Sequence, residues 1–361
     1  MVRSAHPTSR LVRSGYLRKV ISILTLLWCS LVAAAPLHAA DDDFDSLSFD
    51  DAPLDEPIEY PDWFKLSFLN LREDLQEAVQ GGKRGLIVYF GQKHCPYCKM
   101  LMQVNFAKSD IVAYTRTHFD FVATDIWGDR SLTDLSGAAW TEKTFAEQQQ
   151  ATFTPTLLFY DADGNEALRL RGYYPPYRFR AALEFVADGH YKKESFREYL
   201  ERADPPPRFE PEDLNGQPFF AAPPYVLDRS RIAGQRPLAV FFEQGDCHAC
   251  DVLHSGPLLN DVITGQLALL DAVQLDMWSD TLVVTPAGVR TTARQWADEL
   301  GLFYTPTLIF FDQRGREIIR VDSVVNFYRL RTVLDYVLSG AHQRGLSFQR
   351  WRQNPMPRTD Q

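Results

Sequence analysis

Residues 84–98 read RGLIVYFGQKHCPYC, and residues 236–250 read RPLAVFFEQGDCHAC. In both stretches a short apolar run precedes two cysteines that are separated by two residues. Such a run is typical of a buried strand, and the apolar-periodic residues that follow each cysteine pair indicate a helix. The two stretches therefore predict the same unit twice: a strand, a cysteine pair and a helix that begins at the cysteines.

This internal repeat extends further along the chain, at a spacing close to 152 residues. DIWGD at 125–129 matches DMWSD at 276–280, and FTPTLLFYD at 153–161 matches YTPTLIFFD at 304–312. Each copy reads strand, cysteine helix, strand, helix, strand, turn, strand, helix, an order typical of α/β folds. We therefore predict an α/β protein of two tandem domains, each with a central mixed β-sheet flanked by helices.

The chain length and the composition between the copies predict the domain boundaries. At ~150 residues per domain, the 361 residues indicate two domains. The stretch between the copies is rich in proline, a composition that stiffens a chain without building a core. In chain order we expect a signal peptide (1–40), an acidic disordered spacer (41–60), a first domain (61–203), a Pro-rich linker (204–225), a second domain (226–340) and a polar tail (341–361).

The first forty residues have the layout of a secretory signal. They hold five cationic residues and no acid, followed by an apolar run at 20–35 and small residues up to Ala40. We expect cleavage before Asp41, with an uncleaved membrane anchor as the alternative, and Cys29 leaves with the signal. The chain is thus predicted to be exported to a periplasm of the Gram-negative type, and to touch the membrane only if the signal is uncleaved.

The charge of the chain excludes nucleic acid as an expected partner. Removal of the signal changes the net charge from −9 to −14, and an acidic surface repels phosphate. Much of this excess lies in residues 41–57, which hold no Lys or Arg. We favour a solvated spacer here over an acidic docking segment.

The placement of each cysteine pair at a helix start suits thiol–disulfide exchange. The thiolate is the reacting species, and a helix N-terminus can lower the cysteine pKa from near 8.5 to ~3.5–7.5. Three residues of spacing place the second thiol one turn along, where it can attack the mixed disulfide. We therefore assign Cys95 and Cys247 as the attacking cysteines and Cys98 and Cys250 as the resolving ones.

Three other uses of these cysteines were weighed. A structural disulfide across so short a loop gains about 2 kcal/mol, against ~4–5 kcal/mol for a loop of a hundred residues, so it is disfavoured but stays open. Zinc also stays open, because His248 and His254 lie close to the second pair, although one such pair supplies only two thiolates. Covalent haem is excluded because Lys99 and Asp251 stand where it needs a histidine. We expect no metal and no cofactor.

A strand that leads into C-x-x-C, followed some sixty residues later by Thr-Pro before an apolar strand, resembles the thioredoxin superfamily. More narrowly, GQKHCPYCKM at 91–100 together with DIWGD and FTPT resembles the SoxW-type periplasmic thioredoxins. The resemblance covers residues 62–203 well and residues 226–338 more loosely.

The resemblance gives a role to the two Thr-Pro pairs, Thr154-Pro155 and Thr305-Pro306. It implies that each proline is cis, faces its cysteine pair and presents the backbone before it to a substrate strand. The alternative is an ordinary proline at a strand edge.

The chain departs from the thioredoxin pattern around each pair. The Trp usually found before the first cysteine is His94 in one copy and Asp246 in the other. Many thioredoxins carry a buried acid six residues before that cysteine. In this chain the position is occupied by Tyr89 in the first copy and by Phe241 in the second. We assign four residues that tune the acidity of the cysteines at the two sites: His94, Pro96, Tyr97 and His248. For the two histidines, the alternative of a polar side chain that simply faces solvent stays open.

From these features we expect a periplasmic dithiol reductase of oxidised exported proteins, itself reduced again by a membrane electron carrier. A disulfide oxidase or isomerase is the second interpretation, because the residues between the cysteines do not by themselves set the potential. A third is a peptide-docking module in which one or both pairs do not turn over. We also expect the two sites to differ in reduction potential, and the tandem arrangement permits a relay between them.

Overall fold

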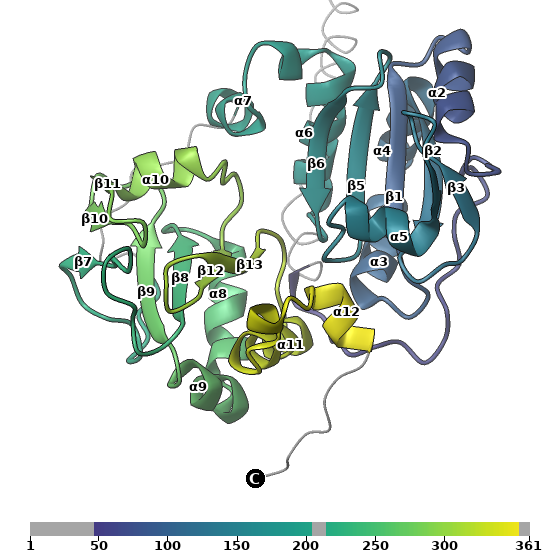
Figure 1. Cartoon of the computed structure of the whole chain (residues 1–361). Coiled ribbons are helices and arrows are strands. Elements are labelled where there is room, and N and C mark those ends of the chain that lie inside the picture. The colour runs from purple at the N-terminus through teal and green to yellow at the C-terminus, as the bar shows by residue number, and fades with distance from the viewer. Residues whose placement is uncertain (1–46, 204–213, 354–361) are drawn as a thin grey trace, which may run out of the picture. The chain divides into compact units, whose positions relative to one another are not determined.

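A computed structural model describes residues 47–203 and 214–353. The predicted signal peptide, Cys29 and the first residues of the acidic spacer lie outside the described residues. By their contacts, the described residues of both predicted domains belong to a single unit (Figure 1).

The first domain is built on a four-stranded sheet of order β2-β1-β5-β6, in which β1 is parallel to β2 and antiparallel to β5. Every residue of β1 is buried, because its alternate side chains face two apolar cores, one on each face of the sheet. The elements are α2 (Leu71–Gln80), β1 (Gly85–Gly91), α3 (Pro96–Met100), a π-helical turn (Leu101–Asn105), α4 (Ser109–His118), β2 (Phe119–Asp125), β3 (Ser131–Thr133), β4 (Ala139–Thr141), α5 (Glu142–Gln148), β5 (Thr156–Asp161), β6 (Glu166–Arg171), α6 (Pro176–Ala187), a 3₁₀ turn (His190–Lys192) and α7 (Phe196–Ala203).

The second domain repeats this sheet in the order β9-β8-β12-β13, with β8 parallel to β9 and antiparallel to β12. This second mixed sheet confirms the predicted fold class of two α/β domains. The elements are β7 (Tyr225–Val226), β8 (Leu238–Glu243), α8 (His248–Ser255), a 3₁₀ turn (Pro257–Leu259), α9 (Asp261–Leu267), β9 (Asp271–Asp276), β10 (Leu282–Val284), β11 (Arg290–Thr292), α10 (Ala293–Glu299), β12 (Thr307–Phe311), β13 (Glu317–Val321), α11 (Phe327–Leu338), a 3₁₀ turn (Ala341–Arg344) and α12 (Phe348–Gln353).

The described parts of three stretches are more ordered than their composition indicated. In the predicted linker, Phe219 and Phe220 pack against the core of the second domain, and β7 pairs with β10. In the predicted tail, Phe348 and Trp351 of α12 are buried in the same core. The described part of the acidic spacer also differs from the expected disorder, because Leu47 is buried in a core of the first domain. In each case apolar side chains among the polar ones supply the burial that a solvated segment lacks.

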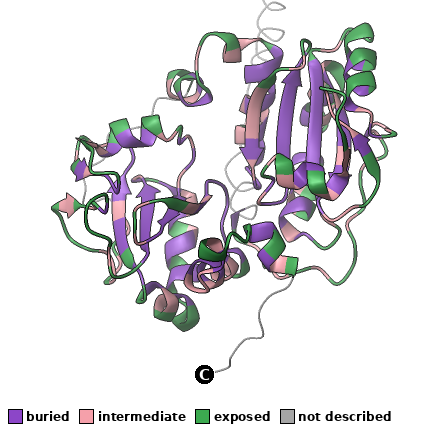
Figure 2. Cartoon of the chain, viewed as in Figure 1, coloured by how far each residue is buried: buried purple, intermediate pink, exposed green. Residues whose placement is uncertain are grey.

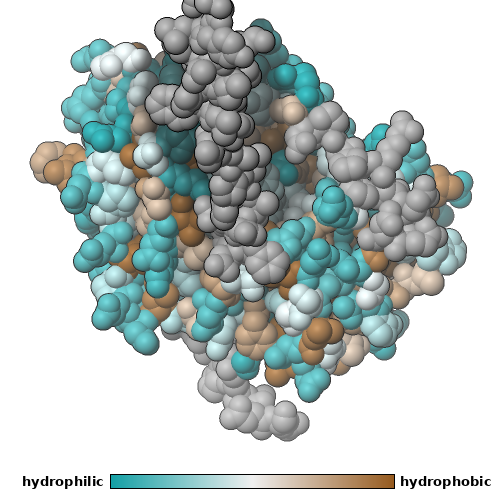
Figure 3. Space-filling model, turned by 180° about the vertical axis from the view of Figure 1, so that it is seen from behind, coloured by the Kyte–Doolittle hydropathy of each residue, from teal (hydrophilic) through white to brown (hydrophobic). Residues whose placement is uncertain are grey.

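Among the described residues, burial follows the strands and exposure the turns. Figure 2 shows the strands of both sheets as mostly buried and the turns between elements as exposed. On the face drawn in Figure 3, outside the grey atoms, hydrophilic residues predominate and apolar ones are scattered. Within residues 47–203 and 214–353, no helix combines the length and apolar character needed to cross a membrane.

Candidate redox sites

The first cysteine pair lies at the N-terminus of α3. Cys95 is the N-cap in an extended conformation, and its Sγ accepts a hydrogen bond from the Cys98 backbone N–H at 3.0 Å. Pro96 occupies the first turn of α3, where its fixed φ suits a helix start. The Thr154-Pro155 bond is cis, and Thr154 Oγ1 lies 3.2 Å from Cys95 Sγ. The fold therefore brings Cys95, Cys98 and the Thr-Pro pair together.

This geometry separates the acidities of the two thiols. Burial acts to raise the pKa of Cys95, but hydrogen bonds with Cys98 and Thr154 outweigh it and lower that pKa. Burial first, and then the neighbouring Cys95, raise the pKa of Cys98 well above its usual range. The first thiol is thus the one that ionises, which fits the attacking role predicted for it.

Cys95 is nearly enclosed, with 1% of its surface exposed, yet it lines a pocket of about 820 Å³. His94 and Trp127 of the first domain and Arg329 and Arg352 of the second also line this pocket. The His94 side chain is exposed, and its Nδ1 lies 2.9 Å from the Leu54 carbonyl oxygen. The Cys95 sulfur is therefore approached through the pocket rather than from an open surface.

Tyr97, between the two cysteines, is a buried anchor. Its hydroxyl donates to Asp51 Oδ2 at 2.7 Å and accepts from the Asn326 backbone N–H at 2.9 Å. The Arg329 guanidinium carbon lies 3.3 Å from the centre of its ring, a cation–π contact. Tyr97 thus links the cysteine helix to both the N-terminal segment and α11.

Sequence reasoning missed Asp51 and Arg329 as parts of this site. Asp51 is 6% exposed and accepts the backbone N–H groups of Tyr328 and Arg329, both at 2.8 Å. Arg329 Nη2 donates to the Thr154 carbonyl at 3.0 Å, so it holds the backbone that we expected to face a substrate strand. Nothing in an acidic run marks one member as buried, and nothing around Arg329 indicates a contact with residues so distant in sequence.

The second cysteine pair has the same backbone frame. Cys247 is the N-cap of α8, and its Sγ accepts from the Cys250 backbone N–H at 3.1 Å. The two cysteines form a disulfide. The Thr305-Pro306 bond is cis, and Thr305 Oγ1 lies 3.5 Å from Cys247 Sγ. His248 is the first residue of α8 and is half-buried.

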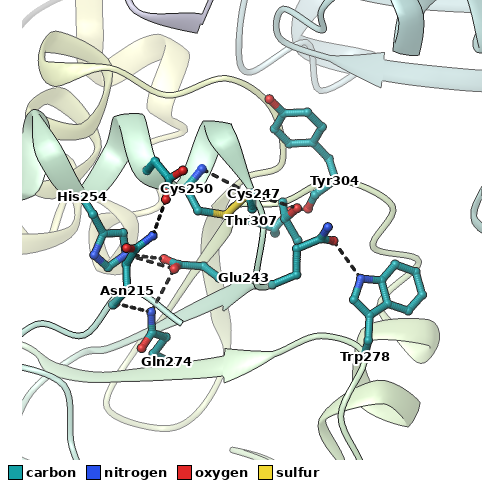
Figure 4. The surroundings of a disulfide bond; sticks show 12 residues. Asn215, Glu243, Cys247, Cys250, His254, Gln274, Trp278, Tyr304 and Thr307 are labelled. Carbon is teal, nitrogen blue, oxygen red and sulfur yellow. Dashed lines mark hydrogen bonds and ion pairs between the residues drawn. A yellow bond between two sulfur atoms is a disulfide. The ribbon is translucent and has the colours of Figure 1, made fainter. Parts of the chain in front are cut away.

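A buried polar network stands beside the second pair and was not anticipated (Figure 4). Glu243, the last residue of β8, is fully buried, and His254 of α8 is 5% exposed. His254 Nε2 lies 3.0 Å from both carboxylate oxygens of Glu243. Gln274 donates to the same carboxylate at 2.9 Å. The one available signal was a charged residue at the end of an otherwise apolar strand.

The corresponding place in the first domain holds no such network. Gly91 stands where Glu243 stands, and a Cβ built on it would meet the Tyr89 hydroxyl oxygen at 2.2 Å. Burial, and then the neighbouring Cys98, raise the pKa of Tyr89 well above its usual range. A phenol therefore fills the space behind the first pair, where an acid and a histidine lie behind the second.

Three further residues near the pairs make polar contacts. His254, weighed as a zinc ligand, binds Glu243 instead, and the described residues contain no group of three His, Cys, Asp or Glu that could hold a metal ion. Trp127 and Trp278 each donate from the indole nitrogen to a glutamine that precedes the cysteines, Gln92 at 2.7 Å and Gln244 at 2.8 Å.

Comparison with known proteins agrees with this geometry. The sequence model of the thioredoxin-like domain family matches the chain twice, at residues 71–187 and 226–338. A search of curated proteins found no match. Among solved structures, the chain is similar to a thioredoxin-fold protein from Helicobacter pylori, at 25% identity and a TM-score of 0.29, over 33% of this chain and 78% of that chain.

Two more distant structural matches were found. One is a DsbH oxidoreductase at 17% identity and a TM-score of 0.26, over 36% of this chain and 91% of that one. The other is a disulphide isomerase from Xylella fastidiosa Temecula1 at 15% identity and a TM-score of 0.24, over 41% and 98%. These scores carry no functional argument, so the family assignment rests on the two matches to the domain model.

Proposed function

Since the chain belongs to the thioredoxin-like domain family and carries two of its domains, we propose that it reduces disulfide bonds in exported partner proteins. That the chain is a thiol–disulfide oxidoreductase follows from the family and from a Cys-x-x-Cys at the start of α3 and of α8. The observation that carries the proposal is the difference in acidity between the two thiols of the first pair: the pKa of Cys95 is lowered and that of Cys98 is raised.

The exchange proceeds in two balanced steps. The Cys95 thiolate attacks one sulfur of a partner disulfide, a mixed disulfide forms, and the other partner sulfur leaves as a thiolate. Cys98 then loses its proton and attacks Cys95 Sγ, which breaks the mixed disulfide and releases the second partner thiolate. The partner gains two electrons, and Cys95 and Cys98 end as a disulfide.

The cellular location of the protein and the source of its electrons are part of the same proposal. The signal-like residues 1–40 and the resemblance to SoxW-type proteins support a periplasmic location. The oxidised pairs then need a reductant, and a membrane electron carrier is the proposed source. The net charge of −9 gives no support for a nucleic-acid partner.

Reduction of insulin by the full chain tests this function. With dithiothreitol as the electron source, we expect turnover by the unaltered chain, a large loss in Cys95→Ser, and a smaller loss in Cys247→Ser. Turnover in Cys95→Ser equal to that of the unaltered chain would contradict the role given to the first pair. Absence of turnover in every form would instead support a peptide-docking module.

A further inference from the structure

We infer that the second domain gates the first cysteine pair. Residues of α11 and α12 cover Thr154 and leave Cys95 accessible to a small disulfide, whereas a protein strand reaches the pair only after this cover detaches. The inference rests on the proposed function, because it requires Cys95 and Cys98 to exchange with disulfides, and it adds a substrate class and a means of regulation to that site. The cover consists of six residues that contact the first domain here: Asn326, Tyr328, Arg329, Phe348, Gln349 and Arg350.

The backbone that we expected to meet a substrate strand is already bonded. The Thr154 carbonyl oxygen accepts a hydrogen bond from Arg329 Nη2 at 3.0 Å, and Thr154 is 3% exposed. Strands pair when the N–H groups of one bind the carbonyl oxygens of the other. A substrate strand that pairs with Thr154 therefore has to take the place of Arg329.

The residue before Thr154 is also covered. Phe153 is 4% exposed and packs in a core of the second domain, where its ring centre lies 5.3 Å from that of Phe348 in α12. The Arg329 guanidinium carbon lies 5.2 Å from the centre of the same ring. Burial of an aromatic side chain stabilises such a contact. A strand laid along residues 153–154 would therefore meet α11 and α12 instead of a free groove.

Two polar contacts hold α12 on the first domain away from the cysteines. Gln349 Nε2 donates to the Ile126 carbonyl at 3.1 Å. Arg350 binds Glu147 of α5 through two hydrogen bonds, Nη2 to Oε2 at 2.8 Å and Nε to Oε1 at 3.2 Å, the two-pronged geometry that favours an arginine–carboxylate pair. None of these four residues lines the pocket that contains Cys95. They can therefore be changed without altering the groups that carry out the exchange.

The cover leaves a pocket in front of the first sulfur. Cys95 lines this cavity of about 820 Å³ together with Phe348 and Arg352, and cavities of roughly 300–1,000 Å³ hold small molecules. The Cys95 thiolate attacks one sulfur of a small disulfide and expels the other as a thiolate. Cys98 then loses its proton and attacks Cys95 Sγ, so the small disulfide ends as two thiols and the pair as a disulfide.

The two kinds of substrate therefore depend differently on the cover. A small disulfide reacts whether the cover is attached or detached, because it enters through the pocket. A protein strand reacts only with the detached form, and its rate is scaled down by the fraction of chains in that form. A minority form of this kind typically holds about 0.1–10% of the molecules.

The test uses the full chain with Cys247→Ser and Cys250→Ser, so that only the first pair reports. The reduced chain is mixed with an excess of insulin or of bis(2-hydroxyethyl) disulfide, a small neutral disulfide, and samples are quenched with acid at intervals. Alkylation and mass spectrometry of the peptides that carry Cys95 and Cys98 give the rate of oxidation. We expect the small disulfide to react at least about tenfold faster than insulin at equal disulfide concentration.

Variants of α12 then detach the cover. Arg350→Glu replaces attraction to Glu147 by repulsion and should raise the rate with insulin at least about threefold, with no change for the small disulfide. The charge swap Arg350→Glu with Glu147→Arg should restore the unaltered rate. Gln349→Ala is an independent variant with the same expected direction. Arg344→Glu is the matched control, because Arg344 is exposed and donates to the Ser339 carbonyl within the second domain, and it should change neither rate.

The outcomes separate the inference from the proposed function. Insulin that reacts as fast as the small disulfide while the cover is unaltered overturns the inference without any change to α12. Folded Arg350→Glu and Gln349→Ala chains that react with insulin at the unaltered rate overturn it too, as does an Arg350→Glu effect that Arg344→Glu reproduces. In these cases the proposed function stands. A first pair that neither disulfide oxidises contradicts the proposed function itself.

Discussion

The two cysteine pairs share a backbone frame and differ in what surrounds it. In both, the first cysteine caps a helix and accepts from the N–H of the second, and a cis Thr-Pro bond lies alongside. Behind the first pair lies the Tyr89 phenol, and beside the second lies the Glu243–His254 unit. The two domains thus share the backbone geometry around their cysteines and differ in the ionisable groups that lie beside each pair.

The surroundings in front of the pairs differ as well. Arg329 contacts the Tyr97 ring and donates to the Thr154 carbonyl at the first site. At the second site, no hydrogen bond to the Thr305 carbonyl is found among residues 47–203 and 214–353. A substrate strand that pairs with Thr154 must therefore displace Arg329, whereas one that pairs with Thr305 meets no such group.

The largest expected effect in this comparison comes from Arg329→Met. The substitution removes the charge, the cation–π contact and the hydrogen bonds to the Thr154 and Val324 carbonyls. We expect a loss of about 2–4 kcal/mol in the free energy of unfolding. The pKa of Cys95 should rise, because the positive charge of Arg329 contributes to lowering it.

Denaturant unfolding and the pH profile of Cys95 alkylation by iodoacetamide measure these two effects. Arg178→Met is the matched control, because Tyr177-Arg178 corresponds in the repeat to Tyr328-Arg329. It should leave the alkylation profile unchanged. Equal profiles for the unaltered chain and Arg329→Met would show that Arg329 has no influence on the first thiol.

A smaller effect concerns the stability of the reduced chain at alkaline pH. Burial raises the pKa of Cys98 in the folded state, so above the ordinary thiol pKa the unfolded chain releases a proton that the folded chain retains. The contribution of Cys98 to the free energy of unfolding is therefore fully present below the ordinary thiol pKa. It falls as the pH rises above that value, by up to about 1.4 kcal/mol per pH unit. Cys98→Ala should flatten this part of the curve, and an unchanged slope in Cys98→Ala would contradict the assignment.

Much of the fold was accessible from the sequence because its signals are local. The repeat, the apolar runs before Cys95 and Cys247 and the Thr-Pro pairs lie within short stretches, and they predicted two domains of the observed class. Both Thr-Pro bonds are cis, as the resemblance implied, and Thr154 and Thr305 lie beside Cys95 and Cys247.

The rest depends on packing between segments far apart in the chain. Asp51 lies in an acidic run whose composition indicates solvation, yet it caps α11 across more than two hundred residues. Glu243 is the one charged residue of an apolar strand, and only the fold places it against His254. Composition and periodicity do not report which member of a polar set is buried.

The most direct test of two exchange-active but divergent pairs is their separate reduction potentials in the full chain. The chain is equilibrated with a series of glutathione redox buffers, its free thiols are alkylated, and peptides that carry Cys95/Cys98 and Cys247/Cys250 are quantified by mass spectrometry. We predict that both pairs titrate and that their midpoints differ. A single shared midpoint, or a pair that stays in one state throughout the series, would contradict this account.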